Sequence, residues 1–323
     1  MQHMLTIAKK EYLDSMKSQL FLVLLAFLLL LTATSIVVAS FDFQNKLAEY
    51  NQALQTLKAL GKNPDVSAPR FFPLKMLRGT VNYLEIIGAI IGIILGYISI
   101  AKEKGKNTLQ LLLTRPIGRY DIVSGKVLGN SILIFSVLAV TAVTIYLIMW
   151  SVGGVQISTP ELIKLGLVIL ASHFYVMFFF CMASFLALKF SSLPNALIFS
   201  VVIWLTFVLL IPQIGDTMDP DNQIPGGFFK SMQVTKIQEK NILTKFQTYE
   251  TIRNALEESS VTKHYERLSF ALLGIKDLYN NKNLGMIFQD KWPDVLWLAV
   301  FFLMALLGEY FLLARNARIL HNR

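Results

Sequence analysis

The stretch LFLVLLAFLLLLTATSIVVAS, residues 20–40, decides the class of fold to which this chain belongs. Fourteen of its residues are Leu, Ile, Val or Phe, and none is charged. A helix needs roughly 20 such residues to cross a hydrocarbon core of about 30 Å, and each favours insertion by about 0.3–0.6 kcal/mol. We therefore expect this stretch to be a membrane-spanning helix.

Five further segments of the 323-residue chain are long and apolar enough to cross a bilayer. Hydrophobic residues make up 54% of the chain and charged residues only 16%, whereas soluble domains carry about 25% charge. The sequence thus predicts an all-α membrane protein with six transmembrane helices. The expected spans are residues 20–40, 82–101, 124–150, 162–188, 195–213 and 293–314.

The basic residues indicate how the chain is oriented. The net charge of +9 arises largely from Lys and Arg placed between apolar spans, where anionic lipid headgroups attract them, so no nucleic-acid partner is expected. Lys and Arg are about twice as dense in the segments that face the cytoplasm if both termini lie inside. We expect a multi-pass protein of the cell membrane whose residues 1–19, 102–123 and 315–323 face the cytoplasm.

Two segments on the opposite side, 41–81 and 214–292, are too long for simple turns. In the second, Ile242, Phe246, Tyr249, Ile252 and Leu256 recur at three- and four-residue steps, which predicts an amphipathic helix within an extracytoplasmic helical region. Such a helix caps its own bundle, docks an external partner or shapes an exit for substrate, and the pattern does not choose among these.

The segment between the second and third spans reads KEKGKNTLQLLLTRPIGRYDIVSGKVLG, residues 102–129. Leu109, Leu112 and Leu113 fall on one face of a short helix. Pro116 and Gly118 should end it, because proline cannot continue a helix and glycine favours its C-terminal cap. Asp121 is expected to cap the next helix, which should run unbroken to about Trp150. The short helix either passes force from a soluble partner into the bundle or lies on lipid headgroups.

At these residues the chain resembles the ABC-2 type permeases, the membrane subunits of ATP-binding-cassette transporters. That family combines a glutamate-rich turn, Gly-Thr-Leu, a leucine run, a proline followed by arginine, and Gly-Lys at the start of the third span. Asn107 departs from the pattern, which usually has glycine there, while Ala8-Lys9-Lys10-Glu11 and the six-span layout extend the resemblance. The matching residues are Glu103, Thr108, Leu109, Leu111, Leu112, Leu113, Pro116, Arg119, Gly125 and Lys126.

The resemblance implies that residues 102–123 are a coupling segment, with a coupling helix at residues 108–115 that sits in a groove of a separate ATPase subunit. It also implies that the cytoplasmic N-terminal segment (1–19) is amphipathic. Two permease copies, as a homodimer or heterodimer, are implied to work with two ATPase subunits using ATP and Mg²⁺. The residues it assigns to ATPase coupling are Glu103, Thr108, Leu109, Leu112, Leu113, Arg115, Pro116 and Arg119, with Gly125 and Lys126 as the motif at the third span.

The chain itself is expected to bind no cofactor. Neither Gly61-Lys62 nor Gly125-Lys126 completes a phosphate-binding loop, because Thr56 and Tyr120 stand where the upstream glycine is required. The sequence contains no HExxH and no GxSxG, and its single cysteine, Cys181, builds no thiolate cage, so neither a metal site nor an enzyme is expected.

Two ionisable residues lie within predicted spans, where such residues are costly and often functional. His173 is expected to form hydrogen bonds between helices in preference to carrying protons, and Glu309 is expected to pair with Arg315 or Lys189.

The expected function is transport, with export of hydrophobic or amphipathic compounds, peptides, lipids or glycans favoured by the family association. Two alternatives stay open: transmission of mechanical work to an extracytoplasmic partner without transport, and an ATP-independent secondary carrier.

Overall fold

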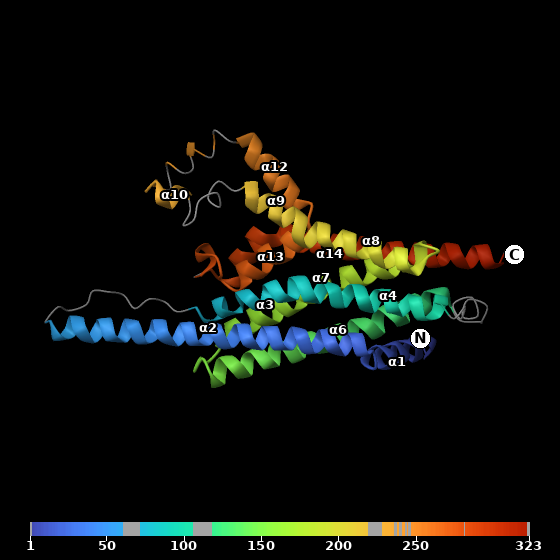
Figure 1. Cartoon of the computed structure of the whole chain (residues 1–323), viewed down its shortest axis with the longest axis horizontal. Coiled ribbons are helices and arrows are strands. Elements are labelled where there is room, and N and C mark those ends of the chain that lie inside the picture. Colours follow the sequence, from blue (N-terminus) through green and yellow to red (C-terminus); the bar gives the residue numbers. More distant parts are fainter. Residues whose placement is uncertain are drawn as a thin grey trace.

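The computed structural model is all-helical over the residues that it describes, which contain no strand (Figure 1). These residues are 2–60, 72–105, 118–218, 228–235, 238, 241–242, 244, 247–280 and 282–321. For residues 119, 230, 249, 277 and 314–321 only the backbone is described.

Among the described residues, six helical stretches are long and apolar enough to span a membrane, as the sequence predicts. In the first half, α1 (Gln2–Met16) precedes α2 (Gln19–Ala59), and a second span combines η1 (Pro73–Leu77), α3 (Arg78–Tyr83), η2 (Leu84–Gly88) and α4 (Ala89–Gly105). The remaining spans are α6 (Arg119–Ser151), α7 (Thr159–Lys189), α8 (Leu193–Leu205) with η3 (Thr206–Leu210) and α9 (Ile211–Met218), and α14 (Leu284–His321). Between α9 and α14 lie α10 (Phe228–Ser231), α12 (Gln247–Glu258), α13 (Val261–Leu272) and η5 (Asp277–Tyr279).

Helix α7 forms the centre of the bundle, where it packs against α4, α6, α8, α13 and α14 (Figure 1). Glycines bring α4 unusually close to it. A Cβ added at Gly92 would lie 2.5 Å from the Val176 carbonyl oxygen, and one at Gly96 would lie 2.1 Å from that of Phe180. Small residues spaced four apart let helix backbones approach in this way, so α4 and α7 form a tightly packed pair.

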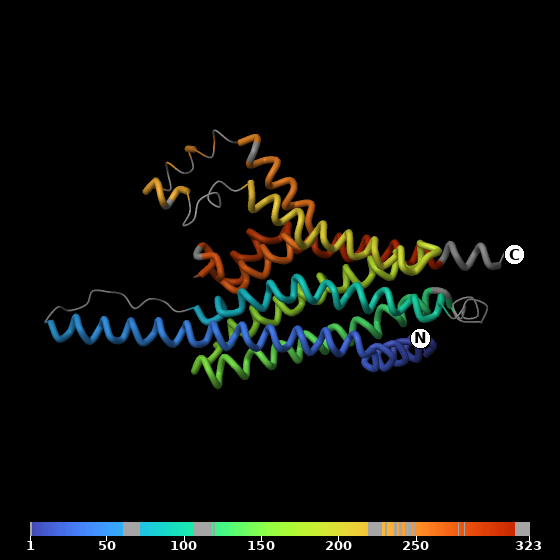
Figure 2. Tube along the Cα trace, viewed as in Figure 1, coloured from blue at the N-terminus to red at the C-terminus, as the bar shows by residue number. Residues whose placement is uncertain are grey.

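Helix α2 continues well past the bundle, as the blue tube shows (Figure 2). The sequence pattern ends the first span at Ser40, but the helix runs on to Ala59, about 28 Å further at 1.5 Å per residue. The stretch NKLAEYNQALQTLKA, residues 45–59, contains no proline or glycine and is rich in strong helix formers. Local propensity therefore extends the helix after the apolar run has ended.

Helix α13 is a short helix buried between α7 and α14. Beside it lie two π-helical turns, η2 and η3, in which the regular backbone bonding is interrupted. In each turn a carbonyl accepts a side-chain hydrogen bond: Glu85 O from the Tyr175 hydroxyl at 2.8 Å, and Phe207 O from the Ser260 hydroxyl at 2.9 Å. Ser260 is also the N-cap residue of α13, so this helix is fixed directly to one of the π-helical turns.

The amphipathic helix expected from the 242–256 pattern corresponds to α12, which packs against α9 and α13. Phe246, one of the residues in that pattern, lies outside the described residues.

Candidate functional site

The coupling segment is flanked by the end of α4 and the start of α6, at the end of the molecule where α1 lies (Figure 1). Helix α6 begins at Arg119 with Gly118 as its N-cap, so Asp121 is not the cap that we expected. Asp121 instead occupies the first turn, where a negative charge favours the helix dipole. Residues 106–117 are outside the described part, and with them Thr108, Leu109, Leu112, Leu113, Arg115 and Pro116.

Two motif residues, Glu103 and Lys126, meet Glu11 in a buried ion cluster. The Lys126 ammonium lies 2.9 Å from a Glu11 carboxylate oxygen, 2.9 Å from one of Glu103, and 2.8 Å from the Ser99 carbonyl oxygen. These three acceptors match the three donors of an ammonium group. Lys126 is only 2% exposed. The cluster thus joins α1, the last turn of α4 and the second turn of α6 at the two ends of the coupling segment.

Lys10 adds a second cation to the ion cluster. Its ammonium lies 3.2 Å from Glu103, 3.4 Å from Glu11 and 4.0 Å from Asp14. Burial alone would raise the pKa of Glu11, but Lys126, Lys10 and the Ser99 hydroxyl outweigh it and hold that pKa below its ordinary value. Burial would likewise lower the pKa of Lys10, yet Glu11 and Glu103 raise it. Glu11 and Lys10 therefore favour their charged forms near neutral pH.

A second layer of hydrogen bonds supports the ion cluster. Asn130, fully buried one turn after Lys126, donates to the Lys126 carbonyl oxygen at 3.0 Å and accepts from the Ser15 hydroxyl at 3.0 Å. On the other flank, Lys104 donates to the Ala187 carbonyl oxygen at 3.0 Å and to that of Phe190, which ties the end of α4 to the end of α7. Sequence reasoning missed this layer; the polar residues Ser99 and Asn130 within apolar spans were the available signal.

Glycines let α1 lie directly on α6. A Cβ added at Gly125 would lie 2.7 Å from Cβ of Ile7, and one at Gly129 would lie 2.4 Å from the Ala8 carbonyl oxygen. Gly125 of the family motif is therefore a contact point for α1, and Gly129 repeats it one turn later. This contact positions Glu11 to reach Lys126.

The two intramembrane candidates, His173 and Glu309, lie on α7 and α14, and the Lys126 ammonium of the ion cluster acts electrostatically on Glu309. His173 Nε2 is 3.0 Å from the Ser131 hydroxyl and so connects α7 to α6. Glu309 is fully buried and accepts a hydrogen bond from Ser184 at 2.6 Å. Lys189, one of the two partners expected for Glu309, has its ammonium over the Phe185 ring, and the Arg315 side chain is not described.

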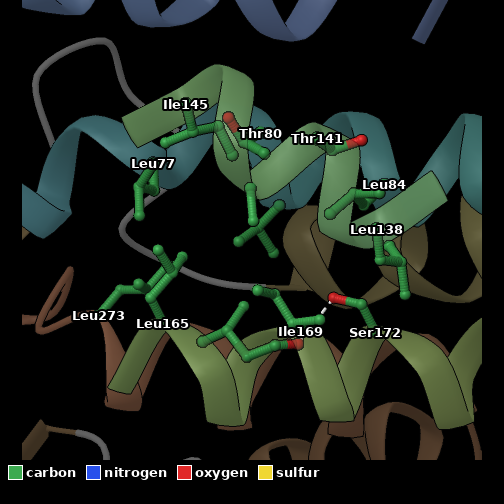
Figure 3. Close-up of a pocket in the computed structure, with 13 residues that line it drawn as sticks. Leu77, Thr80, Leu84, Leu138, Thr141, Ile145, Leu165, Ile169, Ser172 and Leu273 are labelled. Carbon is green, nitrogen blue, oxygen red and sulfur yellow. Dashed lines mark hydrogen bonds between the residues drawn. The ribbon is translucent and has the colours of Figure 1, made fainter. Parts of the chain in front are cut away.

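A small cavity lies between α3, α6 and α7 (Figure 3). Leu77, Leu138 and Leu165 are among the side chains that point into it, and its volume is about 20 Å³. The Thr80 hydroxyl at its wall has no hydrogen-bond partner among the described residues. A cavity of this size holds about one water molecule, which would serve Thr80, and it is too small for a transported substrate.

Six spans around a tightly packed centre, with α1 fixed by ion pairs to both ends of a connecting segment, define the class: a multi-pass membrane protein. Within the described residues, no three or more His, Cys, Asp and Glu side chains are grouped to hold a metal ion. The family model described as ABC-2 family transporter protein matches residues 5–315, nearly the whole chain. The chain belongs to this family and is a permease subunit of an ATP-binding-cassette transporter. A sequence comparison with curated proteins gives no match.

Proposed function

We propose that this permease couples ATP hydrolysis by a separate ATPase subunit to export across the cell membrane. The observation that carries the proposal is the buried ion cluster at both ends of the coupling segment. Glu103 and Lys126 hold the end of α4 and the start of α6 together, and Glu11 adds α1 to them. A force applied by the ATPase at residues 108–115 would therefore move three helices as one unit.

The packing of the bundle supports a route for this movement. Helix α4 contacts α7 through Gly92 and Gly96, and backbones so close transmit displacement because close-packed interiors deform little. Helix α7 in turn contacts α13 and α14. Movement at the coupling segment would thus reach the opposite end of the bundle through α4 and α7.

The proposal assigns the end of the molecule that carries α1 to the cytoplasm, because the ATPase and its ATP are there. The start of α1, the end of α4 and the start of α6 all lie at this end (Figure 2). ATP and Mg²⁺ would be bound by the partner, and this chain would bind neither. Coupling is assigned to Glu103, Thr108, Leu109, Leu112, Leu113, Arg115, Pro116 and Arg119.

A second copy of the permease, identical or homologous, is expected against α2, α4 and α8. These helices line an apolar groove of about 330 Å³ that contains Leu20, Tyr97 and Trp204. Its lining suits a hydrophobic or amphipathic substrate moving between two copies. This is the substrate class that we propose.

The test is purification of the tagged protein from mild detergent, followed by identification of bound partners and an ATPase assay. An ATPase should copurify with the wild type and be lost with Leu112→Asp. The matched control is Leu60→Asp, the same change at a 68% exposed leucine beyond the far end of the bundle. If no ATPase binds the wild type, or if both variants lose it equally, the proposal fails.

One observation favours the second candidate function, mechanical transmission without transport. Helix α2 reaches about 28 Å beyond Ser40 and would carry movement of the bundle to an extracytoplasmic partner. The two functions separate in reconstituted vesicles. ATP-dependent movement of amphipathic compounds supports transport, whereas ATPase activity that an external partner stimulates, without such movement, supports transmission.

A further inference from the structure

Helix α13 is buried on nearly all sides although much of its sequence is polar. Of its 12 residues, all but Glu266 and Arg267 are buried. The buried residues include Thr262, Lys263 and His264. A helix that is buried all round is normally apolar all round. The polar composition of α13 therefore needs an explanation other than burial.

The position of α13 is at the end of the bundle opposite α1, among four of the spans (Figure 1). It packs against α3 and η2 of the second span, α7, η3 of the fifth span, and α14. Phe207 of η3 lies six residues, about 9 Å, before residue 213, where we expected the fifth span to end. Helix α13 thus fills this end of the bundle at a level where the spans are already within the membrane.

Two hydrogen-bond paths connect α13 to the two π-helical turns. The Ser260 hydroxyl at its N-cap donates to the Phe207 carbonyl oxygen of η3 at 2.9 Å. Toward η2, the Thr262 hydroxyl lies 3.3 Å from that of Tyr175, which donates to the Glu85 carbonyl oxygen at 2.8 Å. Helices bend most readily where a π-helical turn interrupts the regular ladder, and such turns are frequent at functional sites. Helix α13 is therefore fixed to the two points at which the second and fifth spans can bend.

Further hydrogen bonds connect α13 to α7 and α14. The Tyr265 hydroxyl is 2.9 Å from that of Ser172, and its ring stacks on the Tyr175 ring with centroids 4.5 Å apart. His264 Nδ1 lies 2.8 Å from an Asp294 carboxylate oxygen. Water can replace each of these polar contacts, because a hydrogen bond within the protein exchanges for one to water with a small net change in free energy. The polar residues of α13 therefore suit a helix that is exposed to water in another state of the protein.

We propose that α13 is a latch: it holds the two π-helical turns in their present geometry and closes this end of the bundle, and its release opens the bundle. This inference rests on the proposed function, because movement driven by the ATPase is what releases the latch. Helix α4 continues directly from η2, and α7 carries Tyr175, so displacement of this close-packed pair acts on the path from α13 to η2. Release uncovers the hydroxyls of Ser172 and Tyr175, which offer hydrogen bonds to the polar part of an amphipathic substrate.

The test follows the reaction of a cysteine on α13 with a membrane-impermeant maleimide in proteoliposomes, in a Cys181→Ala background. The reporter is Ser269→Cys, because Ser269 is fully buried and its hydroxyl has no hydrogen-bond partner among the described residues. Tyr175→Phe with Ser260→Ala removes both paths to the π-helical turns but keeps the Tyr175 ring. Labelling of the reporter should then become about tenfold faster, as expected for the loss of two hydrogen bonds. The control reporter is Ser200→Cys, fully buried on α8 and bonded within its own helix, which should stay unlabelled in the same double variant.

Two results in the double variant would overturn the latch. Unchanged labelling of Ser269→Cys would show that the two paths do not hold α13, and faster labelling of both reporters would show a bundle loosened throughout. In the complex with the ATPase, ATP should accelerate labelling of Ser269→Cys and leave Ser200→Cys unlabelled. If ATP is hydrolysed without this acceleration, the latch is wrong while the coupling proposal stands. If no ATPase binds, the coupling proposal fails, and the double variant still decides whether the two paths hold α13.

Discussion

At the scale of single residues, Lys126 is the cation on which the buried ion cluster depends. Lys126→Met would remove the buried cation between Glu11 and Glu103 and leave the more exposed Lys10 beside both carboxylates. Removing one partner of a buried ion pair costs about 3–5 kcal/mol, so we expect a loss of that size in the free energy of unfolding. Thermal unfolding in detergent measures it. Lys58→Met, at an exposed position on α2, is the control and should change stability by less than about 0.5 kcal/mol.

Glu11 should give the protein an acid limit of stability. Because its pKa in the folded protein lies below the ordinary value of 4.5, the stabilisation is complete above pH 4.5 and is lost as the pH falls through the folded-state pKa. The unfolding temperature should therefore stay level from pH 7 to about 5 and then fall. Glu11→Gln should lower the unfolding temperature at pH 7 and weaken its fall below about pH 5. Glu49→Gln, at an exposed position, should do neither, and equal curves for both variants would contradict the assignment.

The residues of the ion cluster differ in how far the sequence identified them. Glu103, Gly125 and Lys126 were visible through the family resemblance. The contact between Glu11 and Lys126 was not, because 115 residues separate them and no local period connects them. Asn130 looked like an ordinary polar residue in an apolar span, since its function as the support of the Lys126 turn depends on Ser15 from another helix.

At the scale of elements, the contact of α1 with α6 should depend on Gly129. In Gly129→Ala the new methyl group would meet the Ala8 carbonyl oxygen, so α1 must move away and separate Glu11 from Lys126. We expect faster tryptic cleavage at Lys9 and Lys10 in limited proteolysis. Gly166→Ala, on α7, is the matched control because a Cβ there meets nothing within 4 Å. Unchanged cleavage in Gly129→Ala would show that α1 does not need this contact.

The attachment of α13 to the π-helical turn η3 should depend on Ser260. Ser260→Ala leaves the Phe207 carbonyl without its side-chain donor and removes the hydroxyl at the N-cap position. We expect the free energy of unfolding to fall by about 1–3 kcal/mol, the cost of leaving a buried acceptor without a donor. Hydrogen exchange of the α13 amides should then become faster. Ser259→Ala removes an exposed hydroxyl that bonds only locally, to Leu256, and should leave that exchange unchanged.

The spans themselves could be predicted because runs of about 20 apolar residues leave few alternatives. The extension of α2 could not be predicted from hydropathy, which ends at Ser40, although the helix formers beyond it were a usable signal. The π-helical turns left no signal in the sequence. In each turn a backbone carbonyl oxygen that lacks its regular helical partner accepts a hydrogen bond from a hydroxyl outside the turn, that of Tyr175 or Ser260. Such features come from tertiary contacts and not from local propensity.

At the scale of the whole molecule, the sequence predicted the all-α, six-span fold that the structure has. The centre of the bundle was not predictable from hydropathy, because α2 and α7 are both apolar. Two features distinguish α7. It contacts the face of α4 that carries Gly92 and Gly96, and its Ser172 hydroxyl forms a hydrogen bond with the Tyr265 hydroxyl of α13. The position of a span within a bundle depends on where small and polar residues lie, which mean hydropathy does not record.

The proposed orientation of the whole molecule predicts opposite labelling of the two ends of the first two helices. With Cys181 buried and replaced by alanine, Lys58→Cys at the end of α2 should react with a membrane-impermeant maleimide on intact cells. Lys9→Cys, on an exposed position of α1, should react only after the membrane is permeabilised. Because a spanning helix separates the two positions, they cannot lie on the same side of the bilayer. The reverse pattern would place the ion cluster outside the cell, away from any cytoplasmic ATPase, and would rule out the coupling proposal.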